Sequence, residues 1–144
     1  IETLSLRMQR HIENTAVVVA FLEQQQQVES VNHPMLEAHP DHELAKAILP
    51  KGSTAVFSFN IVGGRAAGIK FIENLKLFSH LANVGDAKSL VIHPASTTHH
   101  RMDSVALDKA GISEGLIRLS IGLEDAADIV ADLKAGLRAT QRGL

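Results

Sequence analysis

Apolar residues recur along the chain at two different spacings, and these spacings predict its helices and strands. Residues 1–27 carry one apolar stripe at the 3.6-residue period of a helix, formed by Leu4, Met8, Ile12, Ala16, Val19 and Leu22. Further helices are predicted over residues 39–48, 65–76, 103–110 and 124–137. In the last of these, the acidic residues come early and the basic residues late, which matches the helix dipole.

Alternation of apolar and polar residues predicts the strands. The clearest case is residues 53–62, where Ser58 and Asn60 share one face and the other face is apolar, with Ala55, Phe57, Phe59 and Ile61. Shorter extended segments are predicted over residues 28–33, 78–84, 89–93 and 116–121. Strands and helices alternate without internal repeats, so the pattern predicts an α/β or α+β fold. We expect a mixed, mostly antiparallel sheet covered by helices.

One residue of the last predicted strand breaks its apolar pattern. Ile117, Leu119 and Ile121 share one face of this strand, and Arg118 lies on the other. An unpaired guanidinium that is buried away from water costs roughly several kcal/mol of folding free energy. Arg118 therefore reaches water, pairs with a carboxylate of the chain, or binds an anion from outside. Spacing alone leaves these alternatives open, and only the third is a function.

Composition narrows the classes of function. The chain has 144 residues, which favours one domain, and a net charge of −2, which argues against nucleic acid and anionic membrane surfaces as partners. It has no Trp and no Tyr to stack on bases, and no cysteine, which fits a cytoplasmic location. No apolar run is long enough to span a bilayer. Because the chain begins at Ile1 within a predicted helix, we expect it to be part of a longer polypeptide.

Two other patterns could carry chemistry, but each has a simpler interpretation. The segment from Gly63 to Gly68 follows a strand and opens a helix, yet it lacks the Lys-Ser/Thr of a phosphate loop and the spacing of a dinucleotide motif. A tight turn with close helix packing is favoured. The histidines at 39, 42, 93, 99 and 100 lack a metal-binding motif and suitably spaced acidic ligands, so we predict no metal site.

Two segments resemble a known family. Residues 79–99 (Ser-His-Leu-Ala-Asn-Val-Gly-Asp-Ala-Lys-Ser-Leu-Val-Ile-His-Pro-Ala-Ser-Thr-Thr-His) and 111–125 (Gly-Ile-Ser-Glu-Gly-Leu-Ile-Arg-Leu-Ser-Ile-Gly-Leu-Glu-Asp) resemble the C-terminal domain of the Cys/Met-metabolism PLP-dependent enzymes. Residues 2–11 (Glu-Thr-Leu-Ser-Leu-Arg-Met-Gln-Arg-His) resemble the family's long helix that links the cofactor domain to that C-terminal domain. Among the branches of the family, the Asn-Val-Gly-Asp wording at residues 83–86 is most similar to the O-acetylhomoserine sulfhydrylases.

The resemblance implies a fold and a division of the chain. The fold is the small C-terminal domain of a fold-type-I PLP enzyme, with a sheet of about four strands. Residues 1–27 form the long helix that links to an absent cofactor domain, and residues 28–144 form the domain that binds the substrate carboxylate.

The resemblance also implies roles for individual residues. Arg118 grips the α-carboxylate of the amino-acid substrate, Asn83 helps to hold it, and Thr98 braces the same pocket. The chain has neither the Ser-x-Thr-Lys segment that carries pyridoxal 5'-phosphate nor any Tyr to stack on it, so it supplies no catalytic and no cofactor-binding residue. The cofactor is then bound covalently by the missing large domain of the same polypeptide.

The whole enzyme would be a homotetramer that makes homocysteine from O-acetylhomoserine and sulfide, and the chain alone would be inactive. A related transsulfuration enzyme is an alternative within the family: cystathionine γ-synthase, cystathionine γ-lyase or methionine γ-lyase. Two alternatives of other classes stay open beside it. The chain could be a separate carboxylate-binding module, or a structural domain in which Arg118 pairs with Asp86 or Asp125.

Overall fold

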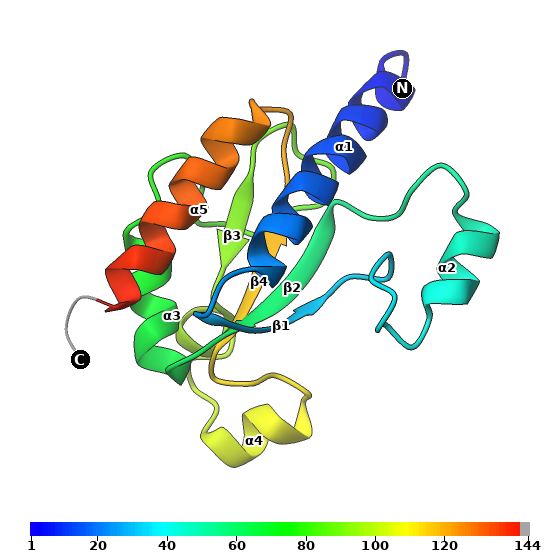
Figure 1. Cartoon of the computed structure of the whole chain (residues 1–144). Helices are drawn as coiled ribbons and strands as arrows, with labels where there is room; N and C mark the ends of the chain where they lie inside the picture. Colours follow the sequence, from blue (N-terminus) through cyan, green and yellow to red (C-terminus); the bar gives the residue numbers. More distant parts are fainter. Residues whose placement is uncertain (142–144) are drawn as a thin grey trace.

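The computed structural model describes residues 1–141, which form one four-stranded sheet with helices packed on it (Figure 1). The predicted fold class is confirmed, and most predicted elements are found close to their expected positions. The helices are α1 Leu4–Glu23, α2 His42–Ile48, α3 Gly64–Glu73, α4 Ser104–Lys109 and α5 Ala126–Gln141, with a 3-10 turn η1 at Pro94–Ser96. The strands are β1 Val28–Asn32, β2 Val56–Ile61, β3 Leu90–Ile92 and β4 Leu116–Ser120.

The strands lie in the order β1-β2-β4-β3, and every neighbouring pair is antiparallel. The expectation of a mixed sheet is therefore wrong for the four strands. Within residues 1–141, the single parallel pairing is an isolated bridge between Ser79 and Leu90. Strands β2 and β4 occupy the centre of the sheet, so the predicted strand around Arg118 has a neighbour on each side.

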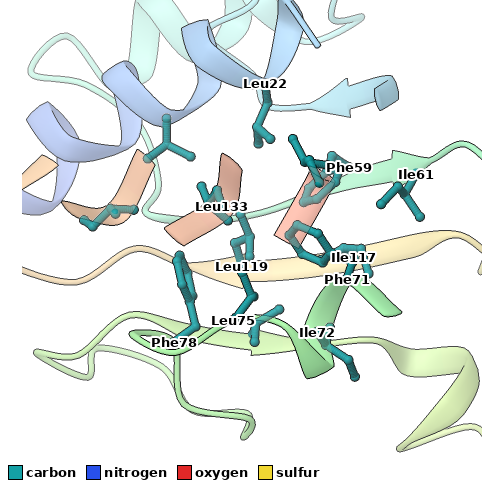
Figure 2. Close-up of a cluster of buried hydrophobic side chains, with 14 of the residues drawn as sticks. Leu22, Phe59, Ile61, Phe71, Ile72, Leu75, Phe78, Ile117, Leu119 and Leu133 are labelled. Carbon is teal, nitrogen blue, oxygen red and sulfur yellow. The ribbon is translucent and has the colours of Figure 1, made fainter. Parts of the chain in front are cut away.

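Helices α1, α3 and α5 supply the apolar side chains that cover one face of the sheet. Figure 2 shows side chains from these helices and from the central strands gathered in one cluster, among them Leu22, Phe59, Phe71, Leu119 and Leu133. The Phe59 and Phe71 rings meet edge to face with their centroids 5.6 Å apart. Burying each such side chain stabilises the fold by about 1.5–3 kcal/mol.

The buried face of α1 differs from the predicted stripe. Val19 and Leu22 are buried as expected, but Leu4, Met8 and Ala16 are exposed. The first turns of α1 project past the sheet, where nothing in the described chain covers them (Figure 1). Further along, three polar residues take the inner positions instead: His11, Asn14 and Thr15. Each is hydrogen-bonded to a backbone carbonyl, which offsets the cost of burying a polar group.

The predicted strand over residues 78–84 is also wrong. Phe78 is buried in the core, Ser79 makes only the isolated bridge, and residues 80–88 form a loop. The Asp132 carboxylate on α5 holds the start of this segment, because it accepts from the backbone N–H groups of Lys76 and Leu77 at 2.9 Å each. A side chain 55 residues further along the chain thus replaces the strand partner that the alternation pattern implied.

Replacing Asp132 should destabilise the fold. In Asp132→Ala, the N–H groups at the start of the 76–78 segment lose their acceptor, which should lower the free energy of unfolding by about 1–3 kcal/mol. Asp128→Ala, one turn earlier on the exposed side of α5, is the matched control and should cost less than about 1 kcal/mol. Equal losses for the two variants in urea unfolding would contradict this role of Asp132.

Candidate functional site

The alternation along β4 places Arg118 on the face of the sheet opposite the helices. Ile117 and Leu119 are fully buried in the core, so the residue between them must point the other way. Arg118 pairs in register with Ser58 on β2 and with Ile92 on β3, and Ser58 pairs in turn with Asn32 on β1. Residues at paired positions point to the same face, so Asn32, Ser58, Arg118 and Ile92 form one row across the sheet.

Arg118 lines a pocket of about 390 Å³ on this open face. The pocket is lined by residues of three strands and the loops beside them: Asn32, Pro34, Thr54, Val56, Phe57, Ser58, Pro94, Leu116 and Arg118. Within residues 1–141, none of the ion pairs and hydrogen bonds involves the Arg118 guanidinium. The half-buried charge thus faces a pocket without a carboxylate partner from the described chain.

The neighbouring polar row on the same face differs from the Arg118 row. There the Asn60 amide donates to the Ser30 hydroxyl at 3.0 Å, and the Ser113 hydroxyl donates to Asn60 Oδ1 at 2.6 Å. That row satisfies its polar groups internally. In the Arg118 row, Asn32 Oδ1 is hydrogen-bonded to His39 at 2.9 Å, but the Ser58 hydroxyl and the Arg118 guanidinium have no side-chain partner within residues 1–141, which leaves their donors available to a ligand.

The internal ion pair expected under the structural alternative is absent from the described residues. Asp125 accepts from the Ala127 backbone N–H at 2.8 Å, and Asp86 accepts from the Lys88 N–H at 3.0 Å. This donation by Lys88 is the main cause that lowers the pKa of Asp86 below its usual value, with a smaller contribution from the Asn83 amide. Each carboxylate therefore accepts from a backbone N–H of its own turn and not from Arg118.

Thr98 lies on the β3 side of Arg118. It follows η1, is exposed, and its hydroxyl is hydrogen-bonded to His99 Nδ1 at 2.8 Å. Together with His80, Leu81 and Ile92, it lines a second pocket of about 210 Å³. Ile92 is the register partner of Arg118, so Thr98 lies near the row, but no hydrogen bond among the described residues joins Thr98 to Arg118.

Asn83 lies in the exposed loop that leads into β3. Its Oδ1 accepts from the Val84 N–H at 2.8 Å, and its amide donates to Asp86 at 3.4 Å, so both bonds stay within the loop. Gly85, with φ of 78°, provides the left-handed turn that brings Asp86 back toward Asn83. Among the described hydrogen bonds, none joins Asn83 to Arg118 or Thr98. The structure thus places Thr98 and Asn83 on segments next to the β3 edge of the sheet. No hydrogen bond among the described residues connects either of them to Arg118.

His93 organises the turn between β3 and Thr98. Its ring is fully buried, Nε2–H donates to the Glu114 carbonyl at 2.7 Å, and Nδ1 accepts from the Ser96 hydroxyl at 2.8 Å. A side chain at Gly68 would overlap this ring, which explains the last glycine of the 63–68 segment as close helix packing. Burial lowers the pKa of His93 below its usual 6.5.

The other chemical alternatives find no support in the described residues. No group of three or more His, Asp or Glu side chains within residues 1–141 is arranged to hold a metal ion. No helix in that range is both long and apolar enough to cross a bilayer. All seven lysines are exposed, at positions 46, 51, 70, 76, 88, 109 and 134. A lysine that carries pyridoxal phosphate needs an enclosing pocket, so the residues present do not fit that cofactor.

The sequence pattern alone does not identify Ser58, Asn32 and Pro94 as lining residues of the Arg118 pocket. Alternation placed Ser58 on a polar face, but only the β2–β4 register puts it opposite Arg118. In the sequence, Pro94 stands out only as the first residue of the Pro-Ala-Ser-Thr-Thr-His segment that also contains Thr98. The signal for Asn32 was weaker still, because it ends a short edge strand.

A model of the family described as Cys/Met metabolism PLP-dependent enzyme matches residues 1–138. Among curated proteins, O-acetyl-L-homoserine sulfhydrylase 1 of Thermus thermophilus is 48% identical over 136 residues, which is 94% of this chain and 32% of that protein. The L-methionine gamma-lyase of Fusobacterium nucleatum subsp. polymorphum is 45% identical over 136 residues, or 94% of this chain and 34% of that protein. The chain thus spans about a third of the length of these relatives.

Two solved structures are also similar to this chain. The cystathionine gamma synthase of Xanthomonas oryzae pv. oryzae, in complex with aminoacrylate and cysteine, superposes with a TM-score of 0.88 at 42% identity. That match covers 99% of this chain and 36% of the other. A Campylobacter jejuni structure that contains N'-pyridoxyl-lysine-5'-monophosphate has a TM-score of 0.86 at 38% identity, over 95% of this chain and 32% of that one.

The burial of His93 predicts a pH dependence of stability. Its folded pKa lies below the unfolded value of about 6.5, so the neutral ring stabilises the fold above that pH, and this contribution is lost as the pH falls through the folded pKa. Between about pH 7.5 and about pH 5, His93→Gln should therefore lose less stability than the parent chain in thermal unfolding. The exposed-site control His100→Gln should keep the parent's pH slope, and an identical slope for His93→Gln would contradict the prediction.

Proposed function

Because the chain belongs to the Cys/Met-metabolism PLP-dependent enzyme family, we propose that it supplies the substrate-carboxylate part of an O-acetylhomoserine sulfhydrylase. That enzyme would form homocysteine from O-acetylhomoserine and sulfide. The similarity to O-acetyl-L-homoserine sulfhydrylases at 44–48% identity supports this reaction. The observation that carries the role of the chain is the half-buried Arg118, which faces a pocket without an ion-pair partner in the described chain.

Arg118 is suited to a carboxylate for geometric reasons. A guanidinium presents a planar fork of N–H donors that can bind both oxygens of one carboxylate, and this fixes the orientation of the ligand as well as its affinity. Two features favour such a ligand here. The apolar pocket neighbours Val56 and Leu116, which share the face of Arg118, reduce access of water to the bond, and β4 is central in the sheet, which keeps the arginine backbone rigid.

Asn83 and Thr98 would complete the clamp from the β3 side. Both lie on exposed segments next to that edge, where Thr98 lines a pocket together with Ile92, the register partner of Arg118. We expect the Asn83 loop and the Thr98 turn to close on the carboxylate when the substrate is bound. Such a clamp positions the reacting part of the amino acid against groups outside this chain.

The chain would serve as one part of a larger enzyme. We propose that residues 1–27 link it to a cofactor domain and that residues 28–144 form the carboxylate domain. Pyridoxal phosphate is the cofactor of the family, and the exposed lysines of this chain do not fit it. The cofactor would therefore be held by the large domain, in a homotetramer that we expect to be cytoplasmic, and this chain alone would not catalyse.

Related reactions are the main alternative, because similar proteins include an L-methionine gamma-lyase and a cystathionine gamma synthase. An amino-acid carboxylate would need the same arginine in each case, so the site of this chain does not distinguish them. Product analysis of the intact enzyme with O-acetylhomoserine and sulfide, with cysteine in place of sulfide, and with methionine would separate the three reactions.

The carboxylate role predicts a specific kinetic defect. In the intact enzyme that carries this chain, Arg118→Ala should weaken binding of O-acetylhomoserine by about 2–4 kcal/mol, seen as a rise in KM, because a charge-assisted bond is lost. Arg138→Ala, an exposed arginine on α5, is the control and should leave KM unchanged. An unaltered KM in Arg118→Ala would remove Arg118 from the site.

The division of labour predicts that the chain alone does not take up the cofactor at one specific lysine. Titration of the 144-residue chain with pyridoxal phosphate should give no saturable band in the visible spectrum beyond slow, unselective reaction with exposed lysines. A saturable band that one lysine substitution abolishes would contradict the proposal that the cofactor lysine lies outside this chain.

A further inference from the structure

Glu124 joins the segments that carry two of the three proposed clamp residues, Arg118 and Asn83. It lies just after β4, in the turn that leads into α5, and its carboxylate accepts from the Ser89 backbone N–H at 2.7 Å and from the Ser89 hydroxyl at 2.9 Å. Ser89 is fully buried and ends the loop that contains Asn83. Glu124 thus connects the end of the Arg118 strand to the base of the Asn83 loop.

The base of this loop is further pinned to the strand. The Ser89 hydroxyl accepts from the Gly122 N–H at 2.9 Å, and the Leu123 N–H donates to the Ala87 carbonyl at 2.9 Å. A side chain at Gly122 would overlap Ser89, Ala87 and the Glu124 carboxylate, so the approach of the two segments requires glycine there. On its other side, the loop is closed by the Ser79 N–H, which donates to the Ser89 carbonyl at 3.0 Å.

Helix α1 reaches the same place. The Asn14 amide donates to the Gly122 carbonyl at 3.0 Å and to the Glu124 carbonyl at 2.8 Å, and the His11 ring is hydrogen-bonded to the Ile121 carbonyl at 2.6 Å. These polar side chains are buried, in a helix whose early apolar positions are exposed. The turn after β4 is thereby fixed to the helix that leads into the domain.

We propose that Glu124 is a positioning residue of the carboxylate clamp, which sets the Asn83 loop at the correct distance from Arg118. This inference rests on the proposed function. Asn83 and Arg118 lie on different segments, and no hydrogen bond among the described residues joins them directly. Their spacing therefore depends on what holds the loop base to the strand end. A carboxylate does this well, because hydrogen bonds to an ionised acceptor are shorter and stronger than neutral ones.

The chain itself supplies a matched comparison. Asp125 is the next residue and carries the same charge, but its carboxylate is exposed and, within residues 1–141, accepts only from the Ala127 N–H, in its own helix start. Removing it takes away a local cap, whereas removing Glu124 releases Ser89, 35 positions earlier in the chain.

The test compares four variants of the intact enzyme: Glu124→Ala, Glu124→Gln, Asp125→Ala and Arg118→Ala. In Glu124→Ala, we expect the KM for O-acetylhomoserine to rise about tenfold, with kcat within about threefold and the KM for sulfide unchanged, because sulfide has no carboxylate to orient. Glu124→Gln should recover most of the loss, since its amide oxygen still accepts from the Ser89 N–H. Asp125→Ala should match the parent enzyme.

Two results would overturn the inference while leaving the proposed function in place. One is a KM that rises in Arg118→Ala but not in Glu124→Ala. The other is a Glu124→Ala variant in which kcat and both KM values change together, as a general structural defect would produce.

If Glu124→Ala does not fold, Glu124→Gln and Ser89→Ala take its place in the test. A rise of about threefold in the KM for O-acetylhomoserine is expected in Ser89→Ala, and parent values in both variants would overturn the inference. If Arg118→Ala itself leaves KM unchanged, the proposed function fails.

Discussion

The structure depends on the alternation of residues along strand β4. Its odd-numbered side chains, Ile117 and Leu119, fill the core beneath the three packing helices and are completely buried. The same backbone must then present Arg118 to the opposite face, since successive side chains of a strand point in opposite directions. A shift of one residue in register would move the charge into the core at a cost of several kcal/mol, roughly. Packing on one face thus fixes the position of Arg118 on the other.

Much of the fold could be predicted from local sequence patterns, and the errors have a common physical origin. The alternation in residues 53–62 located β2, and helical spacing located α3 and α5. The stripe of α1 was misplaced because its first turns extend beyond the sheet, so apolar residues there have nothing to pack against. The segment 78–84 alternates like a strand but is held by the distant Asp132 instead. A hydrophobic pattern shows which residues of a segment can be buried. It does not show which distant residue binds that segment.

The candidate site, like the fold, could be predicted only in part from local sequence patterns. Arg118 stood out in the sequence because a charge interrupts an apolar strand, and the structure accounts for its exposure to a pocket. Ser58 and Asn32 could not be identified as its neighbours, because their proximity depends on the pairing of three strands. The connection between Glu124 and Ser89 likewise spans 35 residues and has no local signature. Family resemblance suggested which residues matter, whereas only the fold showed what holds them.

We propose that Arg118 receives the α-carboxylate of an amino acid. A crystal structure of the intact enzyme with a bound amino-acid ligand tests this most directly. We expect both carboxylate oxygens to lie within about 3 Å of the Arg118 guanidinium nitrogens, with the Asn83 loop closed against the same group. A carboxylate bound elsewhere, with Arg118 directed into solvent, would contradict it.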